Sequence, residues 1–329
     1  MSTPTSNRFG GTFFKAFVIC ADQGKRRVDG LTAVIRIKLA ENFRAVFYAP
    51  FYATHALGFY VGQGVDVELL SSSAPGFGVS ALLDGTVDIT WGGPMRVMKA
   101  REQQPTSPLV CFCEVVARDP FYLIGGNVGP DFKLSALPSL RFAAISEVPT
   151  PWMCLQHDLR EKGVDPTRLN RTADQSMAEN FRALCNNQLD VVQVFEPYPS
   201  MAMQLGAGSI LYAASTRGPT VYTTFIATRD GIERHRTGFR RMVKAIQQTQ
   251  AWLEEHSAEE LAEITASFFP DIARDILVSS LRRYLQAKVW ARAPDVSQEG
   301  FARLAESLSS GGFIARIPKY ESCVDQSLC

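Results

Sequence analysis

The sequence predicts an α/β protein with two similar lobes, each a mostly parallel sheet flanked by helices. Two observations support this. Short apolar runs alternate with segments of helical periodicity, and one helix–turn–strand pattern occurs twice along the chain. The chain has 329 residues, of which 46% are hydrophobic and 20% charged, so it is long enough to build two domains with substantial cores.

The strands of the first lobe are read from apolar or alternating runs bounded by turn residues. They are expected at residues 35–40, 65–70, 87–90 and 109–116, with strands of the second lobe at 141–145 and 191–195. A helix is expected from Phe47 to Leu57, with Gly58 at its C-terminal end. Residues 233–309 show helical spacing almost throughout.

The internal repeat is the most informative pattern. The run Ala81–Ile89 (ALLDGTVDI) matches Ala183–Val191 (ALCNNQLDV) at an offset of 102 residues, and Gly64–Asp66 matches Gly163–Asp165 at an offset of 99. Each copy would contain the end of a helix, a turn with Gly or Asn, and an apolar–Asp–apolar strand start. The alternative is a coincidence between two generic units, but the near-equal offsets favour two lobes of similar build.

Composition excludes several classes of protein. The chain has 34 Lys and Arg against 33 Asp and Glu, which is not the basic footprint of a nucleic-acid-binding protein. No apolar run reaches the ~18 residues that a membrane-spanning helix needs. The 7 cysteines are odd in number and scattered, so no disulfide scaffold is expected. Cys111 and Cys113 are expected on one face of a strand as core residues.

Residues 1–34 are expected to be an extension that is poorly ordered or that comes from a mis-assigned start. The apolar stretch Thr12–Ala21 has the length of a secretory signal, but Lys15 interrupts it. Ile19 also stands where a small residue would precede Cys20 in a lipoprotein-type site. We therefore expect a cytoplasmic protein as the chain is written, and a periplasmic one if residues 1–34 are processed.

A cleft between two α/β lobes would be lined by the loops that follow the C-terminal ends of their strands. In these loops Trp91 and Trp152 offer flat apolar faces for a ring. Acceptors would come from Glu41, Glu114, Glu147 and Glu196, and donors from Arg44, Arg96 and Arg118. The alternatives are that the tryptophans are core residues and that the Glu and Arg side chains form salt bridges at the rim.

Thr150 stands between Pro149 and Pro151, so it is expected to cap a helix with Pro151 at the first position. Such a helix start offers free backbone N–H groups to a polar ligand. Because Glu147 lies beside it in the sequence, we expect a neutral or cationic ring rather than a strong anion such as a sulfonate.

Motifs of common enzymes are absent from the sequence. It contains no G-x-S-x-G, no phosphate-binding P-loop and no H-E-x-x-H, and its 4 histidines are isolated. No catalytic residue, metal site or cofactor is therefore expected.

Several segments resemble, in order, the periplasmic-binding-protein-like (type II) family. This family includes alkanesulfonate, taurine and pyrimidine-precursor binding proteins of ABC importers, and the yeast-type thiamine-pyrimidine synthases. The resemblance covers about residues 35–325. It rests on Ala40–Asn42, Tyr48–Ala53, Leu57–Phe59, Gly64–Glu68, Gly85–Ile89, Leu189–Val192 and Phe195–Tyr198.

The resemblance implies a two-lobed clamshell. Lobe 1 would contain residues 35–120 and 226–329, and lobe 2 residues 121–225. The chain would cross between the lobes near Phe121–Gly125 and return near Tyr222–Thr228. A binding protein of this family closes its lobes on a small ligand and delivers it to a membrane permease with an ATPase.

The synthase branch is the alternative function, and the sequence departs from it. Aligned from Asp88, the lysine that would hold pyridoxal phosphate falls at Gly92, and the histidine at Arg96. The cysteine-rich iron motif falls near Gly218–Tyr222, where the chain has no cysteine. The first cleft loop, 41–43, also lacks the cysteine of the related aryl-sulfinate desulfinases. A cytosolic ligand sensor is a further alternative.

The sequence therefore predicts a solute-binding protein of an ABC-type importer, not an enzyme, that closes over a small polar ring compound. The resemblance favours a thiamine-pyrimidine precursor as the ligand. Trp91 and Trp152 would stack on it from opposite lobes. The candidate ligand-binding residues are Asn42, Trp91, Gly92, Arg96, Glu114, Arg118, Glu147, Thr150, Trp152, Glu196 and Tyr222.

Overall fold

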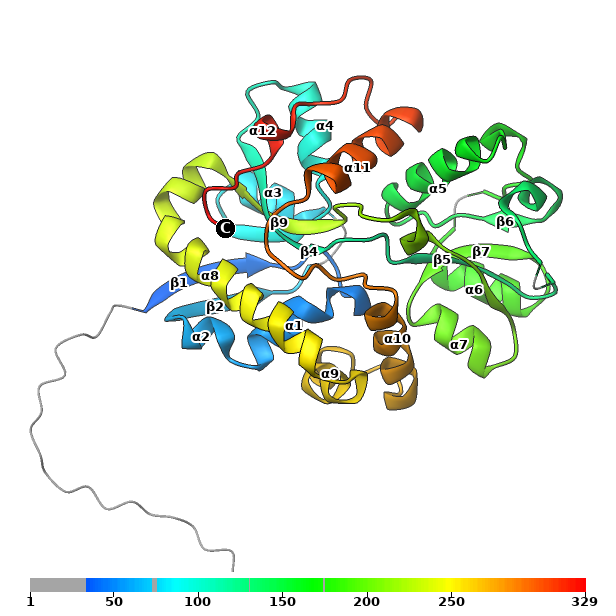
Figure 1. Cartoon of the computed structure of the whole chain (residues 1–329), viewed down its shortest axis with the longest axis horizontal. Helices are drawn as coiled ribbons and strands as arrows, with labels where there is room; N and C mark the ends of the chain where they lie inside the picture. Colours follow the sequence, from blue (N-terminus) through cyan, green and yellow to red (C-terminus); the bar gives the residue numbers. More distant parts are fainter. Residues whose placement is uncertain (1–33, 73–75, 130, 174) are drawn as a thin grey trace, which may run out of the picture. The chain divides into compact units, whose positions relative to one another are not determined.

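Two β-sheets form the framework of the protein. The computed structural model describes residues 34–72, 76–129, 131–173 and 175–329 (Figure 1). The first sheet has the order β2-β1-β3-β9-β4 and the second the order β6-β7-β5-β8. The strands are β1 (Ile35–Ala40), β2 (Val65–Leu70), β3 (Ile89–Gly92), β4 (Leu109–Val116), β5 (Phe121–Gly125), β6 (Phe142–Ala143), β7 (Val191–Phe195), β8 (Ser209–Ala213) and β9 (Thr223–Thr228).

The direction of the strands confirms the predicted architecture. In the first sheet β1 runs parallel to β2 and β3, and β9 is antiparallel to β3 and β4. In the second sheet β6 and β7 are parallel, and β5 is antiparallel to β7 and β8. Each sheet has one reversed strand, β9 in the first sheet and β5 in the second. Each of these strands directly follows a crossover from the other sheet. We call the first sheet with its helices lobe 1, and the second sheet with its helices lobe 2.

Helices cover both faces of the two sheets. They are α1 (Ala49–Ala56), α2 (Phe59–Gly62), α3 (Phe77–Leu83), α4 (Met95–Gln103), α5 (Thr150–Glu161), α6 (Met177–Cys185), α7 (Tyr198–Gln204), α8 (Arg229–Glu255), α9 (Ala258–Thr265), α10 (Arg274–Gln286), α11 (Gln298–Ser310) and α12 (Tyr320–Cys323). Short 3-10 turns are η1 (Val46–Tyr48), η2 (Leu134–Ser139), η3 (Pro166–Arg168), η4 (Ala214–Arg217) and η5 (Ala266–Phe268). Among the described residues we find no helix with the length and apolarity needed to cross a membrane.

The core divides according to the faces of the sheets. On one face of the first sheet, α1 and α8 contribute to a large apolar cluster that continues into lobe 2 through Val194 and Phe195. On the opposite face α3, α4 and α11 form a second cluster. In lobe 2, α5 packs Leu155 and Leu159 against Phe142 and Leu123 of the sheet.

The sequence repeat corresponds to the same local structure in both lobes. Asp88 accepts a hydrogen bond from the backbone N–H of Lys38 (2.9 Å), and Asp190 accepts one from that of Arg141 (2.7 Å). The turn before each aspartate contains a residue with left-handed backbone, Gly85 in one lobe and Asn187 in the other. Each aspartate therefore holds a neighbouring strand segment in register, which explains why the two sequences resemble each other.

The C-terminal region is less continuous than its helical spacing predicts. Residues 287–297 separate α10 from α11 without forming a helix. Within this segment, the Trp290 indole N–H donates to the carbonyl oxygen of Phe47 (2.9 Å). The lobe boundary also lies slightly earlier than the sequence suggests, since β9 joins the first sheet from Thr223. The predicted extension lies, apart from Val34, outside the described residues.

The expectation that Cys111 and Cys113 share one face of a strand is wrong. A β-bulge interrupts the pairing of β4 with β9 between Phe112 and Glu114, and Cys113 has a left-handed backbone (φ 57°). The bulge sends Cys111 into one core cluster and Cys113 into the other. Both thiols are nevertheless fully buried, as predicted for core residues.

We predict that Asp190→Asn lowers the free energy of unfolding by about 1–2 kcal/mol at pH 7, because it weakens charge-assisted bonds to Arg141. Arg141 holds the pKa of Asp190 below its usual value. The native carboxylate therefore contributes stability above about pH 4, and this contribution is lost as the pH falls through its lowered pKa. Urea unfolding at pH 7 and pH 3 measures both effects. Asp66→Asn, at an exposed pair with Arg36, is the control and should change little. Equal losses in the two variants would contradict the prediction.

Candidate functional site

A small cavity lies where the loops of lobe 1 meet the start of α5 in lobe 2. Its volume is about 30 Å³, which is room for about one water molecule. Asn42 follows β1, Gly93 follows β3, and Thr150 begins α5. The cavity thus lies at the C-terminal ends of parallel strands, as ligand sites of open α/β sheets do. It is lined by Asn42, Phe43, Phe47, Tyr48, Gly93, Met95, Arg96, Phe121, Val148, Thr150 and Tyr222.

Aromatic rings form most of the wall of this cavity. Phe47 lies at the centre, with ring centroids 4.2 Å from Tyr48, 6.2 Å from Tyr222 and 6.4 Å from Phe121. It also packs edge-on against Phe195, at 5.2 Å, behind the wall. These rings come from both lobes and fill the space between them. A flat ligand could stack on the same surfaces once the lobes part.

Arg96 is the one charged side chain among the described residues that line the cavity. It is half-buried on the first turn of α4, and no described residue forms a hydrogen bond or ion pair with it. Burial lowers the pKa of Arg96 from its ordinary value, but an arginine stays protonated at neutral pH. A Cβ on Gly76 would lie only 2.8 Å from the guanidinium, so glycine at position 76 leaves room for this cation.

Asn42 organises the polar side of the cavity. Its Nδ2 donates to the Tyr48 hydroxyl (3.2 Å), and its Oδ1 accepts from the backbone N–H of Gly76 (3.1 Å). The side chain therefore links the loop after β1 to the segment that precedes α3. Burial raises the pKa of Tyr48 to about 12, so this hydroxyl stays protonated and can donate.

Further donors face the same region. The Tyr222 hydroxyl is buried and has no hydrogen-bond partner among the described residues. Burial raises the pKa of Tyr222, which keeps its proton available. Thr150 is the first residue of α5, with Pro149 and not Thr150 at the cap position, and no side chain caps this helix. The cavity thus combines a cation, hydroxyl donors and the positive end of a helix, all of which favour a negative group.

The structure places both tryptophans away from the cavity. Trp91 is buried in lobe 1, where its ring stacks on Phe51 (centroids 4.5 Å apart, 9° between planes). Trp152 lies under the guanidinium of Arg171, 4.5 Å from the ring centroid, in a separate groove of lobe 2. Stacking of a ligand between these two rings is therefore not possible in this arrangement. Trp91 is therefore a core residue, which was the alternative interpretation from the sequence.

Glu114, Arg118 and Gly92 do not line the cavity either. The bulge in β4 turns Glu114 toward α11, where Oε2 accepts from the backbone N–H of Ser297 (2.8 Å). Arg118 donates to the carbonyl oxygen of Ser215 (3.3 Å) beside the crossovers. Gly92 directly precedes Gly93 of the cavity wall. A Cβ on Gly92 would lie 3.4 Å from Ile226.

The remaining two glutamates hold helices. Glu147 accepts from the backbone N–H of Met177 at the start of α6 (2.8 Å), and it does not line the cavity. The expectation of a neutral or cationic ring, which depends on Glu147, stays a prediction. Glu196 is fully buried and accepts from Arg283 (2.6 Å), Ser280 (3.1 Å) and the backbone N–H of Ser200 (3.0 Å). Tertiary partners therefore occupy both carboxylates. Of the eleven predicted residues, the structure brings Asn42, Arg96, Thr150 and Tyr222 together at the cavity.

Several wall residues were missed at the sequence level. Phe43 lies in the first loop, where the polar residues are the predicted candidates. Phe47 is at the start of a predicted helix, and Phe121 at the start of a predicted crossover. The signal was available: aromatic residues directly after a strand end in an α/β lobe favour a ring-binding wall. Among the described residues there is no cluster of three or more metal-ligating side chains.

Comparisons with known proteins agree on the fold. A model of the NMT1-like family matches residues 131–267. A protein of Bacillus subtilis (strain 168) named "Putative binding protein YtlA" is 23% identical over 320 residues, covering 97% of this chain and 94% of that one.

Two solved structures extend this similarity. The alkanesulfonate-binding protein SsuA from Xanthomonas axonopodis pv. citri, bound to MOPS, has a TM-score of 0.67 at 13% identity and covers 90% of this chain and 100% of its own. The periplasmic nitrate-binding protein NrtA from Synechocystis PCC 6803 has a TM-score of 0.65 at 15% identity, covering 90% and 87%. The chain therefore has the fold of the periplasmic binding proteins, as its sequence predicts.

The buried Glu114 predicts a pH dependence of stability. Burial raises its pKa to about 7, so between about pH 4.5 and 7 the folded protein binds a proton that the unfolded chain releases. Native stability falls as the pH rises through this range. We expect Glu114→Gln to remove the fall, gaining about 1–3 kcal/mol relative to the native protein between pH 5 and 8.

Chemical denaturation at four pH values measures this difference. Glu254→Gln, at an exposed pair with Arg292, is the control and should follow the native pH profile. A native stability that is flat between pH 5 and 8 would contradict the assignment.

Proposed function

We propose that this protein is the solute-binding protein of an ABC-type importer and that it closes its two lobes over a small organic anion. The observation that carries this proposal is Arg96, a half-buried cation at the cavity without an ion pair among the described residues. Burying a charge is unfavourable unless an opposite charge or hydrogen bonds compensate it. An anionic ligand would supply that compensation.

The aromatic wall narrows the ligand further. Phe47, Phe121 and Tyr222 would enclose a ring or another flat apolar group, while Arg96 and the start of α5 would hold a sulfonate, carboxylate or phosphate. A neutral thiamine-type pyrimidine, the class favoured by the sequence resemblance, would use the wall but leave Arg96 without a counter-charge. A pyrimidine that carries a phosphate ester would use both.

The chemistry of the wall also supports binding rather than catalysis. The described residues that line the cavity include no lysine, histidine, cysteine, aspartate or glutamate. Gly92, at the position of the synthase lysine, is a buried strand residue next to Ile226. Schiff-base, thiolate and carboxylate chemistry therefore lack their groups at this wall, where the titratable side chains are two tyrosines and an arginine.

An importer role implies partners and a location. The closed protein would deliver its ligand to a membrane permease driven by an ATPase, and it would act outside the cytoplasmic membrane after processing of residues 1–34. Sequencing of the N-terminus of the native protein tests this part. An unprocessed chain would favour the cytosolic sensor instead.

We predict that Arg96→Gln weakens the binding of anionic ligands by about 30-fold or more, equivalent to ~2 kcal/mol, because it removes the charge-assisted contact. Isothermal titration calorimetry would use MOPS, benzenesulfonate, benzoate, nitrate, hydroxymethylpyrimidine and hydroxymethylpyrimidine phosphate as probes. Lys99→Gln removes a positive charge from the same helix, where Lys99 pairs with Glu102 outside the cavity, and should retain the native affinity.

The panel also decides between ligand classes. Binding of the anionic rings and not of hydroxymethylpyrimidine would support the proposal. Tight binding of the neutral pyrimidine, unchanged in Arg96→Gln, would replace the anion with the thiamine-type ligand. Binding of none of the six probes, by a correctly folded protein, would count against this ligand class.

A further inference from the structure

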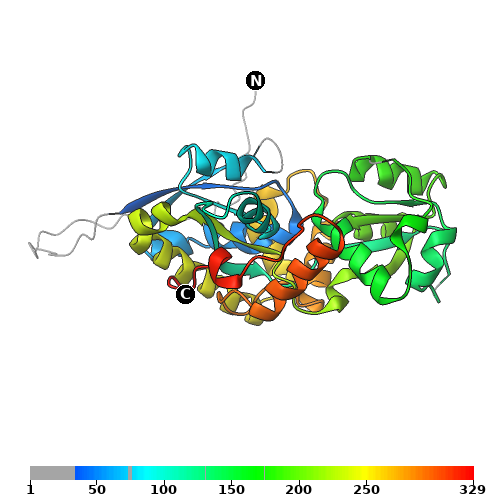
Figure 2. The same cartoon turned by 90° about the horizontal axis from the view of Figure 1, so that it is seen from above.

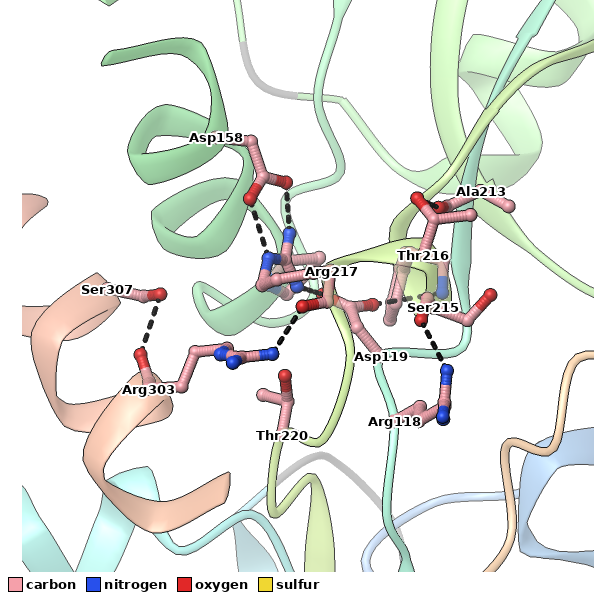
Figure 3. A network of polar contacts seen from close by, with 12 residues as sticks. Arg118, Asp119, Asp158, Ala213, Ser215, Thr216, Arg217, Thr220, Arg303 and Ser307 are labelled. Carbon is pink, nitrogen blue, oxygen red and sulfur yellow. Dashed lines mark hydrogen bonds and ion pairs between the residues drawn. The ribbon is translucent and has the colours of Figure 1, made fainter. Parts of the chain in front are cut away.

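A groove between α5 and α11, of about 440 Å³, is lined by buried polar groups that already bond to one another. Figures 1 and 2 both place α5 beside α11. At the base of the groove, Arg217 donates to Asp158 (Nε to Oδ1, 2.7 Å) and to Asp119 (2.8 Å) (Figure 3). The Tyr212 hydroxyl also donates to Asp158 (2.8 Å). A ligand that entered this groove would compete with bonds that the fold already makes.

A second pocket has the opposite character. It lies between the C-terminal end of α8, the end of α10 and residues 288–292, and its volume is about 280 Å³. At ~30 Å³ for each water-sized group, it has room for about nine such groups, the size of one substituted ring. Its apolar lining comes from Leu253, Tyr284, Leu285 and Trp290, and the ring centroids of Tyr284 and Trp290 are 6.0 Å apart. The pocket is separate from the interlobe cavity, because no described residue lines both.

Gln250 brings an unsatisfied acceptor to this pocket. The residue is only 3% exposed, and its Nε2 donates to the backbone carbonyl of Glu114 (3.0 Å). This contact fixes the orientation of the amide, because the flipped amide would set two oxygens against each other. Oε1 is then buried, and no described residue donates to it. Buried acceptors are almost always paired, so this one favours a ligand that donates an O–H or N–H.

The rim of the pocket adds a second acceptor and a cation. His256 Nδ1 lies 2.8 Å from the carbonyl oxygen of Trp252 and therefore carries the proton, which leaves Nε2 of the neutral ring as an acceptor. Stacking on Trp252 holds this ring in place (centroids 4.0 Å apart, 14° between planes). The exposed Lys288 side chain makes no ion pair or hydrogen bond with the described residues, whereas Arg292 is neutralised by Glu254 (3.2 Å). The rim thus has a positive charge that a carboxylate could pair.

We propose that this pocket is a second ligand site and that it takes a small aromatic carboxylic acid with a hydroxyl or amino group on its ring. The ring would pack on Trp290 and Leu253. The hydroxyl or amino group would donate to Gln250 Oε1, and the carboxylate would lie beside Lys288 at the rim. An acid without the donor would leave Gln250 unpaired, and a neutral phenol would leave Lys288 without a counter-charge. This site is independent of the solute proposed for the interlobe cavity.

The pocket lies behind the wall of the interlobe cavity. The indole N–H of Trp290 donates to the carbonyl oxygen of Phe47 (2.9 Å). The Tyr284 hydroxyl donates to the carbonyl oxygen of Pro120 (3.2 Å), next to Phe121. Phe47 and Phe121 both line the cavity. A ligand that packs on Trp290 and Tyr284 would therefore contact the two side chains that anchor this wall from behind.

Calorimetric titration of the full chain with 4-hydroxybenzoate tests the proposal. The background is Arg96→Gln, which removes the cation of the interlobe cavity. We expect benzoate, which lacks the hydroxyl, and phenol, which lacks the carboxylate, to bind at least about fivefold more weakly than 4-hydroxybenzoate. Lys288→Glu should weaken 4-hydroxybenzoate by at least about fivefold. Lys244→Glu, at an exposed position of α8 outside the pocket, is the matched control and should change the affinity less than about twofold.

A second variant tests the acceptor. Gln250→Met keeps the length of the side chain and removes Oε1, so it should lower the affinity for 4-hydroxybenzoate to that for benzoate. Circular dichroism checks that this variant folds. If it does not fold, the comparison of the two acids with Gln250 in place still tests the acceptor.

Amide hydrogen exchange locates the bound acid. We expect 4-hydroxybenzoate to slow exchange in residues 287–292 by at least about threefold. Slowing in residues 148–153 without slowing in 287–292 would place the acid in the interlobe cavity and overturn the second site, while supporting the proposed solute class. The absence of binding, equal binding of the three compounds, or binding unchanged by Lys288→Glu would overturn the second site as well.

Discussion

The lobes are joined through a buried arginine that two aspartates share. The side chains of Arg217, Asp119 and Asp158 are 4%, 0% and 5% exposed, and removing one partner of such a buried pair typically costs about 3–5 kcal/mol. Burial raises the pKa of Asp119 even with Arg217 beside it. The cluster fixes where each crossover enters lobe 2. It thereby positions Phe121, which follows Asp119 by two residues, and Tyr222, which follows Arg217 by five. Two walls of the cavity depend on this one contact.

Much of the fold was accessible from the sequence because it is encoded locally. The repeated aspartates bond to a neighbouring segment in both lobes, and the residues around them keep a recognisable order. The bulge at Cys113 was not accessible, because β4 is buried on both faces and its continuous apolar run has no alternation for a bulge to interrupt. The break between α10 and α11 was accessible, since Pro294 cannot continue a helix and Ser297 caps the next one.

The site was predicted in part. There is a physical reason why some of its residues were predicted and others were not. Asn42, Arg96, Thr150 and Tyr222 lie at strand or helix ends, where topology alone brings side chains to a common edge. Glu196 also follows a strand directly, but its role depends on Arg283, 87 residues away. Whether a carboxylate faces a ligand or an arginine of the same chain is a tertiary property. A single amino-acid sequence does not contain this information.

If the proposed anionic ligand is correct, the site is a compromise between affinity for the ligand and stability of the fold. Arg96 remains without a counter-charge in the described structure, while two other cations near the lobe junction, Arg217 and Arg283, are paired with buried carboxylates. Selection for a more stable fold alone would favour a carboxylate partner for Arg96 as well. Leaving it unpaired is the arrangement in which binding an anion gives the largest gain in free energy relative to the empty state.

The small volume of the closed cavity has a kinetic consequence. A chamber of about 30 Å³ admits no organic ligand, so under the proposed function every capture event would wait for the lobes to part. At low ligand concentration the observed association rate would increase in proportion to concentration, but at high concentration it would level off at the rate of opening. The rate of lobe opening would then limit how fast ligand reaches the proposed transporter. Soaking ligand into crystals grown without it would be slow for the same reason.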